Sequence, residues 1–163
     1  MMGFFSKQLD YAFYFPERRT PVESKAFDVG EITVTDRVEV TADYYTIDVS
    51  DTQIRVEFHD VGIFTGTSFN GVVLTDIDRE INPMWGFWLQ TNMSGLTRDD
   101  ITVTDDSLAI NFAGTGFSTR TYIHFQILFR ENEITGSRRA DSLSGTTGAD
   151  KLRGLGGDDI LRG

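Results

Sequence analysis

Residues 136–163 read GSRRADSLS, GTTGADKLR and GLGGDDILR, followed by a single glycine. Written in this register, the segment repeats every nine residues. Each repeat opens with glycine, has aspartate at its sixth position and leucine at its eighth: Gly136, Gly145, Gly154, Asp141, Asp150, Asp159, Leu143, Leu152 and Leu161. Three residue types that share one period favour a repeated structural unit over the alternative, a flexible glycine- and aspartate-rich linker.

The spacing predicts a six-residue loop followed by a short strand with one inward apolar side chain. Glycine allows the loop to adopt positive φ angles and leaves its carbonyl groups accessible. Aspartate adds an anionic oxygen, and Ca²⁺ prefers six to eight such hard oxygen ligands. The leucines would stack from turn to turn and form a narrow core. The arrangement matches the G-G-x-G-x-D-x-U-x pattern of a parallel β-roll that binds calcium.

On these residues the segment resembles the RTX family of hemolysin-type calcium-binding repeats. The resemblance implies a secreted bacterial protein that uses calcium as its cofactor, folds its repeats on calcium outside the cell and leaves by type I secretion. The metal-site residues expected from it are Asp141, Gly145, Gly148, Asp150, Gly154, Gly156, Gly157 and Asp159.

The three repeats match the pattern unequally. The third, from Gly154, is close to it, whereas the first has Ser137, Arg138 and Arg139 before its alanine and aspartate. In a β-roll of the RTX type one turn takes two nonapeptides, so one ion is bound by loops n and n+2. We therefore expect one complete site, between the loops of Asp141 and Asp159, in which two arginines are unfavourable. Because the sequence stops at the opening glycine of a fourth repeat, we expect a truncated array.

Composition narrows the classes of partner. The net charge is −10 and the sequence pI is about 4.5, which disfavours nucleic acid as a partner, because phosphate binding needs clustered Lys and Arg. The chain has no cysteine, which excludes thiol catalysis, thiolate metal sites and disulfides. No apolar run is long enough for a transmembrane helix, and no Sec signal peptide is evident at the N-terminus.

Residues 9–130 show the alternation of β-strands. In QIRVEF (53–58), Ile54, Val56 and Phe58 would face inward and the charged residues outward. Further strands are expected at 10–15, 31–34, 38–41, 45–49, 69–74, 85–89, 101–104, 108–112 and 122–129, with tight turns at Ser50-Asp51 and Asp105-Asp106-Ser107. About nine short strands predict an all-β, jelly-roll-like β-sandwich over 1–132, followed by the β-roll repeats over 133–163. A linker is expected near 131–135, and residues 17–25 form a polar stretch in which no strand is assigned.

The segments TQIRVEF, FNGVVLTDID and TNMSGLTRDDITVTDDSLAINFAGTGF also resemble small β domains found beside RTX repeats in bacterial secreted proteins. This second resemblance implies architecture and context only.

Signals for catalysis are weak, and no catalytic residue is assigned. The two histidines, His59 and His124, lie far apart in the sequence, and no nucleophile or phosphate-binding motif is present. Adjacent aspartates such as Asp105 and Asp106 are typical of turns, where they cap backbone groups. A second candidate metal site consists of Asp76, Asp78 and Asn82, whose oxygens are closely spaced as in loop calcium sites.

Aromatic residues are the candidate ligand-binding residues: Trp85, Trp88, Tyr44 and Tyr45. Exposed aromatic rings can stack on sugars. Strict alternation would place Trp85 and Phe87 on one side of their strand and Trp88 on the other, so that one tryptophan would be buried.

The sequence thus favours a secreted, non-catalytic binding or adhesion module whose ligand is a glycan or another cell-surface molecule. Two alternatives stay open. One is an accessory or catalytic domain of a secreted polysaccharide-modifying enzyme, and the other is a self-assembling surface-layer or spacer protein that associates through its repeats.

Overall fold

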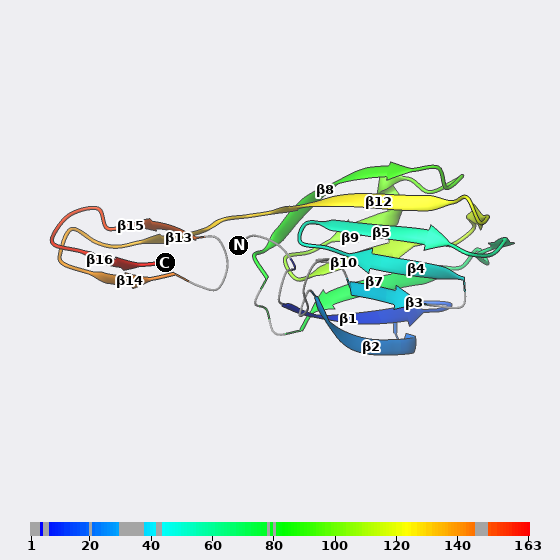
Figure 1. The fold of residues 1–163 in the computed structure, drawn as a ribbon, viewed down its shortest axis with the longest axis horizontal. Coiled ribbons are helices and arrows are strands. Elements are labelled where there is room, and N and C mark those ends of the chain that lie inside the picture. Colours follow the sequence, from blue (N-terminus) through cyan, green and yellow to red (C-terminus); the bar gives the residue numbers. More distant parts are fainter. Residues whose placement is uncertain are drawn as a thin grey trace.

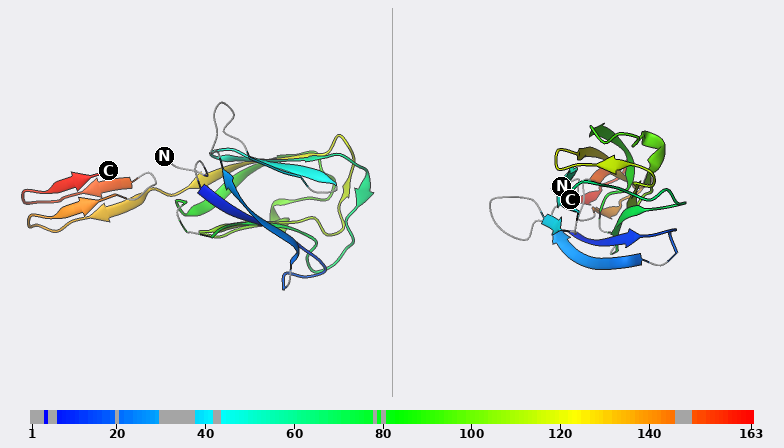
Figure 2. Two further views of the ribbon diagram at one scale, coloured as in Figure 1. Left: turned by 60° about the horizontal axis from the view of Figure 1, so that its bottom comes forward. Right: turned by 90° about the vertical axis from the view of Figure 1, so that its right-hand side faces the viewer.

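The computed structural model describes residues 4, 7–19, 21–29, 38–41, 44–77, 79, 81–145 and 150–163. Two five-stranded antiparallel sheets pack face to face, and a short parallel β-roll follows them in the chain (Figure 1). The predicted all-β sandwich with a β-roll is therefore confirmed. The two sheets are visible as separate layers when the molecule is turned (Figure 2).

The first sheet has the order β2-β1-β7-β10-β9, and the second has the order β3-β4-β5-β12-β8. The strands of the first sheet are β1 (Lys7–Tyr14), β2 (Pro21–Val29), β7 (Gly71–Asp76), β9 (Ile101–Val103) and β10 (Ser107–Asn111). Those of the second are β3 (Val38–Thr41), β4 (Tyr45–Val49), β5 (Gln53–Phe58), β8 (Met84–Thr91) and β12 (Tyr122–Phe129). A small ribbon, β6 (Gly62–Ile63) with β11 (Gly116–Phe117), and a 3-10 turn, η1 (Arg98–Asp100), complete the sandwich. The chain crosses repeatedly between the sheets, as in jelly rolls.

The tight turns predicted at Ser50-Asp51 and at Asp105-Asp106-Ser107 are present, and a third, predicted at Asp36-Arg37, lies outside the described residues. The Ser50 N–H donates to the carbonyl of Gln53 at 2.9 Å and joins β4 to β5. The Thr104 N–H donates to the carbonyl of Ser107 at 2.8 Å and joins β9 to β10. The short polar sequences between the strands therefore set these two hairpins locally.

Two segments differ from the sequence-based expectation. Residues 21–29 form β2, which pairs with β1, although no strand was assigned to this segment from the sequence. As an edge strand that begins with proline, it needs partners along only one side and shows little apolar alternation. The expected linker at 131–135 contains β13 (Asn132–Thr135), the first strand of the roll. The expected strand at 31–34 lies outside the described residues.

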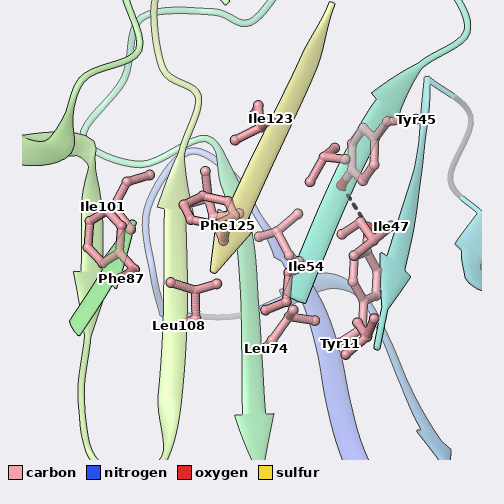
Figure 3. Packing of buried hydrophobic residues seen from close by; sticks show 14 of the residues in the cluster. Tyr11, Tyr45, Ile47, Ile54, Leu74, Phe87, Ile101, Leu108, Ile123 and Phe125 are labelled. Atoms are coloured by element: carbon pink, nitrogen blue, oxygen red, sulfur yellow. Dashed lines mark hydrogen bonds between the residues drawn. The ribbon is translucent and has the colours of Figure 1, made fainter. Parts of the chain in front are cut away.

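The core fills the space between the two sheets. Ile54, Val56 and Phe58 of β5 face inward, as predicted, and their exposed neighbours alternate with them. From the opposite sheet Tyr11 reaches across, and its hydroxyl hydrogen-bonds that of Tyr45 at 2.8 Å (Figure 3). The two buried phenols thus provide a polar link between the sheets inside an apolar core.

Several phenylalanines gather at one end of this core. Phe112 is fully buried and lies 6.0 Å from Phe58 and 4.8 Å from Phe64, measured between ring centroids. Phe117 packs on Phe58 at 4.9 Å. Tilted and edge-on pairs of this kind are favourable beyond simple burial, and this cluster contains four of the thirteen phenylalanines of the chain.

Candidate calcium site in the nonapeptide repeats

The repeat segment, residues 132–163, is a two-layered parallel roll. Strand β13 pairs in parallel with β15 (Asp150–Arg153), and β14 (Ser142–Ser144) pairs in parallel with β16 (Ile160–Arg162) (Figure 1). Asn132 is opposite Asp150 and Ser142 is opposite Ile160, an offset of 18 residues in both pairs (150 − 132 and 160 − 142). One turn of the roll therefore takes two nonapeptides.

The inward side chains of the roll come from the expected position of each strand. Ile134 is opposite Leu152, and Leu143 is opposite Leu161. Ile134, Leu143 and Leu152 are partly buried, whereas Leu161 is 48% exposed. This narrow core buries little apolar surface compared with that of the sandwich, so the loops must contribute to the stability of the roll.

Each repeat loop closes between its first and sixth residues. A Cβ atom on Gly136 would lie 2.9 Å from Asp141 Oδ2, and one on Gly145 would lie 2.7 Å from Asp150 Oδ2. At Gly154 the corresponding contact with Asp159 Oδ2 is even closer. The carboxylate therefore occupies the space that any side chain at the first position would need. This explains why glycine and aspartate keep the same period of nine.

The loops 136–141 and 154–159 lie one on the other. The Asp141 N–H donates to Asp159 Oδ1 at 3.0 Å, and the Ile160 N–H donates to the Asp141 carbonyl at 2.8 Å. A Cβ atom on Gly157 would approach the carbonyl carbon of Arg139 to 2.5 Å. The 18-residue turn thus brings together the two loops, and the two aspartates, between which the sequence predicts the complete site.

The two stacked loops differ in their internal structure. In the first, Asp141 Oδ2 accepts hydrogen bonds from the Ser137 N–H at 2.6 Å and from the Ser137 hydroxyl at 2.9 Å. In the third, Leu155 and Gly157 have positive φ angles of 73° and 104°. In the loop of the first repeat, which departs from the pattern, the serine closes the loop. In the loop of the third repeat, two residues have the left-handed backbone conformation that the glycines of the pattern allow.

The comparison with protein families agrees with this geometry. The family described as RTX calcium-binding nonapeptide repeat (4 copies) matches residues 135–163. Residues 135–163 are therefore an array of RTX repeats. Comparison with curated proteins and with solved structures gave no match. RTX repeats bind calcium and are typical of secreted proteins. In the described part of the chain, no helix is long and apolar enough to cross a membrane.

The donor set of the stacked RTX loops fits calcium. Its side-chain ligands would be Asp141 and Asp159, and the Gly154 carbonyl lies beside Gly136, 2.8 Å from the position of a Cβ atom there. Among the described residues, no three acidic, histidine or cysteine side chains are arranged so that they could hold a metal ion, so backbone carbonyls would supply the other ligands. Such a mixture of carboxylate and carbonyl oxygens suits Ca²⁺ rather than a transition metal.

The charges of the first repeat weaken the attraction of the RTX site for a cation. The two loops carry three aspartates and the arginines Arg138 and Arg139, which leaves a net charge of −1. Both arginines are exposed, and neither forms an ion pair with another described residue. Their charges oppose a cation at this position, so the site attracts calcium less strongly than two loops of the regular pattern would.

The other predicted metal residues of the repeats belong to the opposite end of the roll. Asp150 closes against Gly145, whose N–H donates to the Arg162 carbonyl at 2.6 Å. Gly148 lies outside the described residues. The predicted set is therefore divided: Asp141, Gly154, Gly156, Gly157 and Asp159 lie in the stacked loops, whereas Gly145 and Asp150 do not. Their binding of calcium stays a prediction.

The second candidate metal site lies in the loop after β7. Asp76 is 3% exposed, and its Oδ2 accepts a hydrogen bond from the Ile81 N–H at 2.9 Å. Asn82 is also buried, and its Nδ2 donates to the Arg130 carbonyl at 3.0 Å. Asp78 lies outside the described residues. Both described side chains stabilise the backbone around this loop, and metal binding here stays a prediction.

The candidate aromatic residues do not all reach the surface. Trp85 and Trp88 on β8 are 56% and 68% exposed, and Tyr44 is 50% exposed, whereas Tyr45 is buried in the core. Tyr45 therefore offers no surface to a ligand, because alternation along β4 turns it inward. The expectation that one tryptophan is buried was also wrong.

A β-bulge explains why both tryptophans are exposed. Phe129 of β12 is opposite Met84 and Leu128 is opposite Gly86, so Trp85 is an extra residue on β8. The bulge shifts the alternation by one residue, with the result that Phe87 faces inward while Trp85 and Trp88 are exposed.

Several polar residues that the sequence did not single out as ligand-binding residues share a surface with Trp88. A shallow hollow of about 190 Å³ is lined by Trp88, Leu89, Gln90, His124 and Gln126. The outward positions of these side chains follow from strand alternation. Their proximity does not, because it depends on the pairing of β8 with β12.

Proposed function

We propose that this RTX-repeat protein is an extracellular, calcium-dependent and non-catalytic binding module whose ligand is a glycan. The observation that supports it is the exposure of Trp88 beside the polar side chains of the neighbouring strand. Large aromatic rings are normally covered, and an exposed ring beside hydrogen-bonding groups is typical of a binding surface. Sugars present both an apolar ring face and hydroxyl groups, which suit such a surface.

The non-catalytic part of the proposal is supported by the contacts of the two histidines and of Asp100, which follows Asp99 in the chain. His59 hydrogen-bonds the Thr46 hydroxyl, and His124 hydrogen-bonds the side chain of Gln53. Asp100 accepts hydrogen bonds from the Thr97 N–H and hydroxyl, both at 2.8 Å. These groups stabilise strands and turns, in keeping with a structural role.

Calcium has a structural role in this proposal. When bound, it supplies positive charge that offsets the aspartates of the repeats. Because the roll has only a narrow apolar core, the free energy of calcium binding contributes directly to its folding. At low cytosolic calcium the repeats would stay unfolded, which suits export through a type I channel, and millimolar extracellular calcium would fold them.

Two measurements test the proposal. Thermal unfolding is followed by circular dichroism in millimolar calcium, in excess EDTA and in magnesium, and we expect a calcium-specific rise in the melting temperature. Binding to an array of glycans is then measured in calcium. Glycan binding supports the proposal, whereas a folded, calcium-loaded protein that binds no glycan would overturn it.

A second candidate function, calcium-driven self-assembly, is supported by the exposed side chains of strand β16. Ile160 and Leu161 of β16 are 53% and 48% exposed, and among the described strands β16 pairs only with β14. An open strand edge with exposed apolar side chains can pair with the same edge of another copy. Sedimentation velocity at several protein concentrations, with and without calcium, would distinguish a calcium-dependent oligomer from a monomer.

A further inference from the structure

The outer face of the second sheet carries two rows of side chains that run across its strands. One row follows the pairing of Trp88 with Gln126 and of Gln126 with Gln53. The other follows the pairing of Gln90 with His124, His124 with Arg55, and Arg55 with Asp48. These rows bring together residues from β8, β12, β5 and β4 that lie far apart in the sequence. We call this surface the transverse face.

The transverse face is hollowed along its length. The hollow beside Trp88 is followed by a second one of about 90 Å³, lined by Asp48, Ser50, Gln53, Arg55 and His124. His124 lines both hollows and therefore stands at their junction. Together they form a shallow track from β8 to β4. Three strand spacings separate these strands, or about 14 Å.

The polar side chains of this face are held in place by one another. Gln53 Nε2 donates to Gln126 Oε1 at 3.3 Å, and Gln53 Oε1 hydrogen-bonds His124 Nε2 at 3.3 Å. Gln126 Nε2 in turn donates to the Thr52 carbonyl at 3.2 Å. A side-chain amide has two donor hydrogens and two acceptor lone pairs, so these groups keep capacity for a ligand. Because they are already ordered, a ligand loses less entropy on binding.

Charge favours an uncharged ligand. Arg55, the cationic side chain of the track, forms an ion pair with Glu57 at 2.6 Å. The chain as a whole has a net charge of −10, which repels anionic ligands. Asp48, at the far end of the track, adds a negative charge that also disfavours an anion. Between Trp88 and this end lie the neutral side chains of Gln126 and Gln53, which match the hydroxyl groups of a neutral sugar as the exposed ring matches its apolar face.

We propose that the transverse face binds a linear, uncharged oligosaccharide that runs across the strands, with one sugar ring on Trp88 and its hydroxyl groups on Gln126, His124 and Gln53. The proposal rests on the glycan-binding function proposed above and identifies its site and ligand class. A track of about 14 Å accommodates about three pyranose rings. Trp85, although exposed on the same strand, does not line either hollow and is outside the site.

The test compares two tryptophan variants of the full chain in millimolar calcium. Isothermal titration calorimetry measures binding of neutral hexose oligosaccharides, from disaccharide to hexasaccharide, with an oligouronate as the anionic probe. We expect affinity to rise up to about the trisaccharide and then level off. Trp88→Ala should weaken binding roughly tenfold or more, whereas Trp85→Ala should change it less than about twofold. Gln126→Ala provides a second variant, with circular dichroism melts as a check that each variant is folded.

The outcomes separate this inference from the function on which it rests. Neutral glycan binding that is lost in Trp88→Ala and kept in Trp85→Ala supports both. Glycan binding that depends on Trp85 instead, or that is restricted to the oligouronate, overturns this inference but leaves the glycan-binding function standing. If the folded wild-type chain binds neither these probes nor any other glycan of the array, both this inference and the glycan-binding function are overturned.

Discussion

Leu155 occupies the second position of the third repeat, where the nonapeptide pattern has glycine, and its φ angle is 73°. A left-handed conformation costs a residue with a Cβ atom about 1–2 kcal/mol. The Leu155 side chain is 68% exposed, so its removal sacrifices little burial. Replacement by glycine should therefore relieve the strain of the loop that stacks on Asp141.

The expected gain is smaller than the strain itself, because glycine also makes the unfolded chain more flexible. That effect costs about 0.5–1 kcal/mol, which leaves a net stabilisation of about 0.5–1 kcal/mol. Since folding of the repeats and calcium binding are coupled, the apparent calcium affinity of Leu155→Gly should rise about two- to fivefold.

Calorimetric titration of the full chain with calcium measures this change. Leu155→Ala is the matched control, because it removes the exposed side chain but keeps the Cβ atom and hence the left-handed strain. The calcium affinity of Leu155→Ala should remain within about twofold of the wild-type affinity. If the glycine and alanine variants bind calcium equally well, the reasoning from backbone strain is refuted.

Three further predictions concern single side chains. Asp159→Asn should weaken calcium binding roughly tenfold, while Asp158→Asn, which changes an exposed neighbour, should have a smaller effect in the same titration; equal effects would argue against the stacked site. Phe112→Ala should lower the free energy of unfolding by about 3–5 kcal/mol in urea, and a loss below about 1 kcal/mol would contradict its place in the aromatic core. Burial raises the pKa of the Asp10 carboxyl above its ordinary value of 3.8, so its charge destabilises the folded protein at pH values above the folded pKa. This destabilisation decreases as pH falls through the folded pKa and is absent below 3.8. Asp10→Asn should thus raise the melting temperature at neutral pH but not in strong acid; the same gain at both pH values would contradict this.

The repeats were the part of the chain that could be predicted most completely. The contact between Gly154 and Asp159, and its equivalents in the other repeats, spans only six residues. Because this contact lies within one repeat, it appears in the sequence as glycine and aspartate that recur every nine residues. The stacking of Asp141 on Asp159 follows from the same period, because two nonapeptides make one turn. What the pattern did not predict is that Ser137 closes the first loop.

The strands of the sandwich were also largely predictable, because alternation of apolar residues is a local signal. The inward positions of Ile54, Val56 and Phe58 were predicted correctly. Alternation failed at Trp85, where a bulge in the pairing with β12 shifts the phase of the strand. A bulge depends on the partner strand, so the sequence of β8 alone does not reveal it.

The sequence by itself thus determined the all-β class, the calcium-binding roll and the loops whose aspartates meet. Each of these follows from contacts between residues that are close in the chain or related by a fixed repeat. Only the tertiary structure decided the composition of the transverse face. Gln53 and Gln126 hydrogen-bond across 73 residues, and Trp88 joins them through a third strand. The register between distant strands brings these side chains together, and that register results from the packing of the whole sandwich.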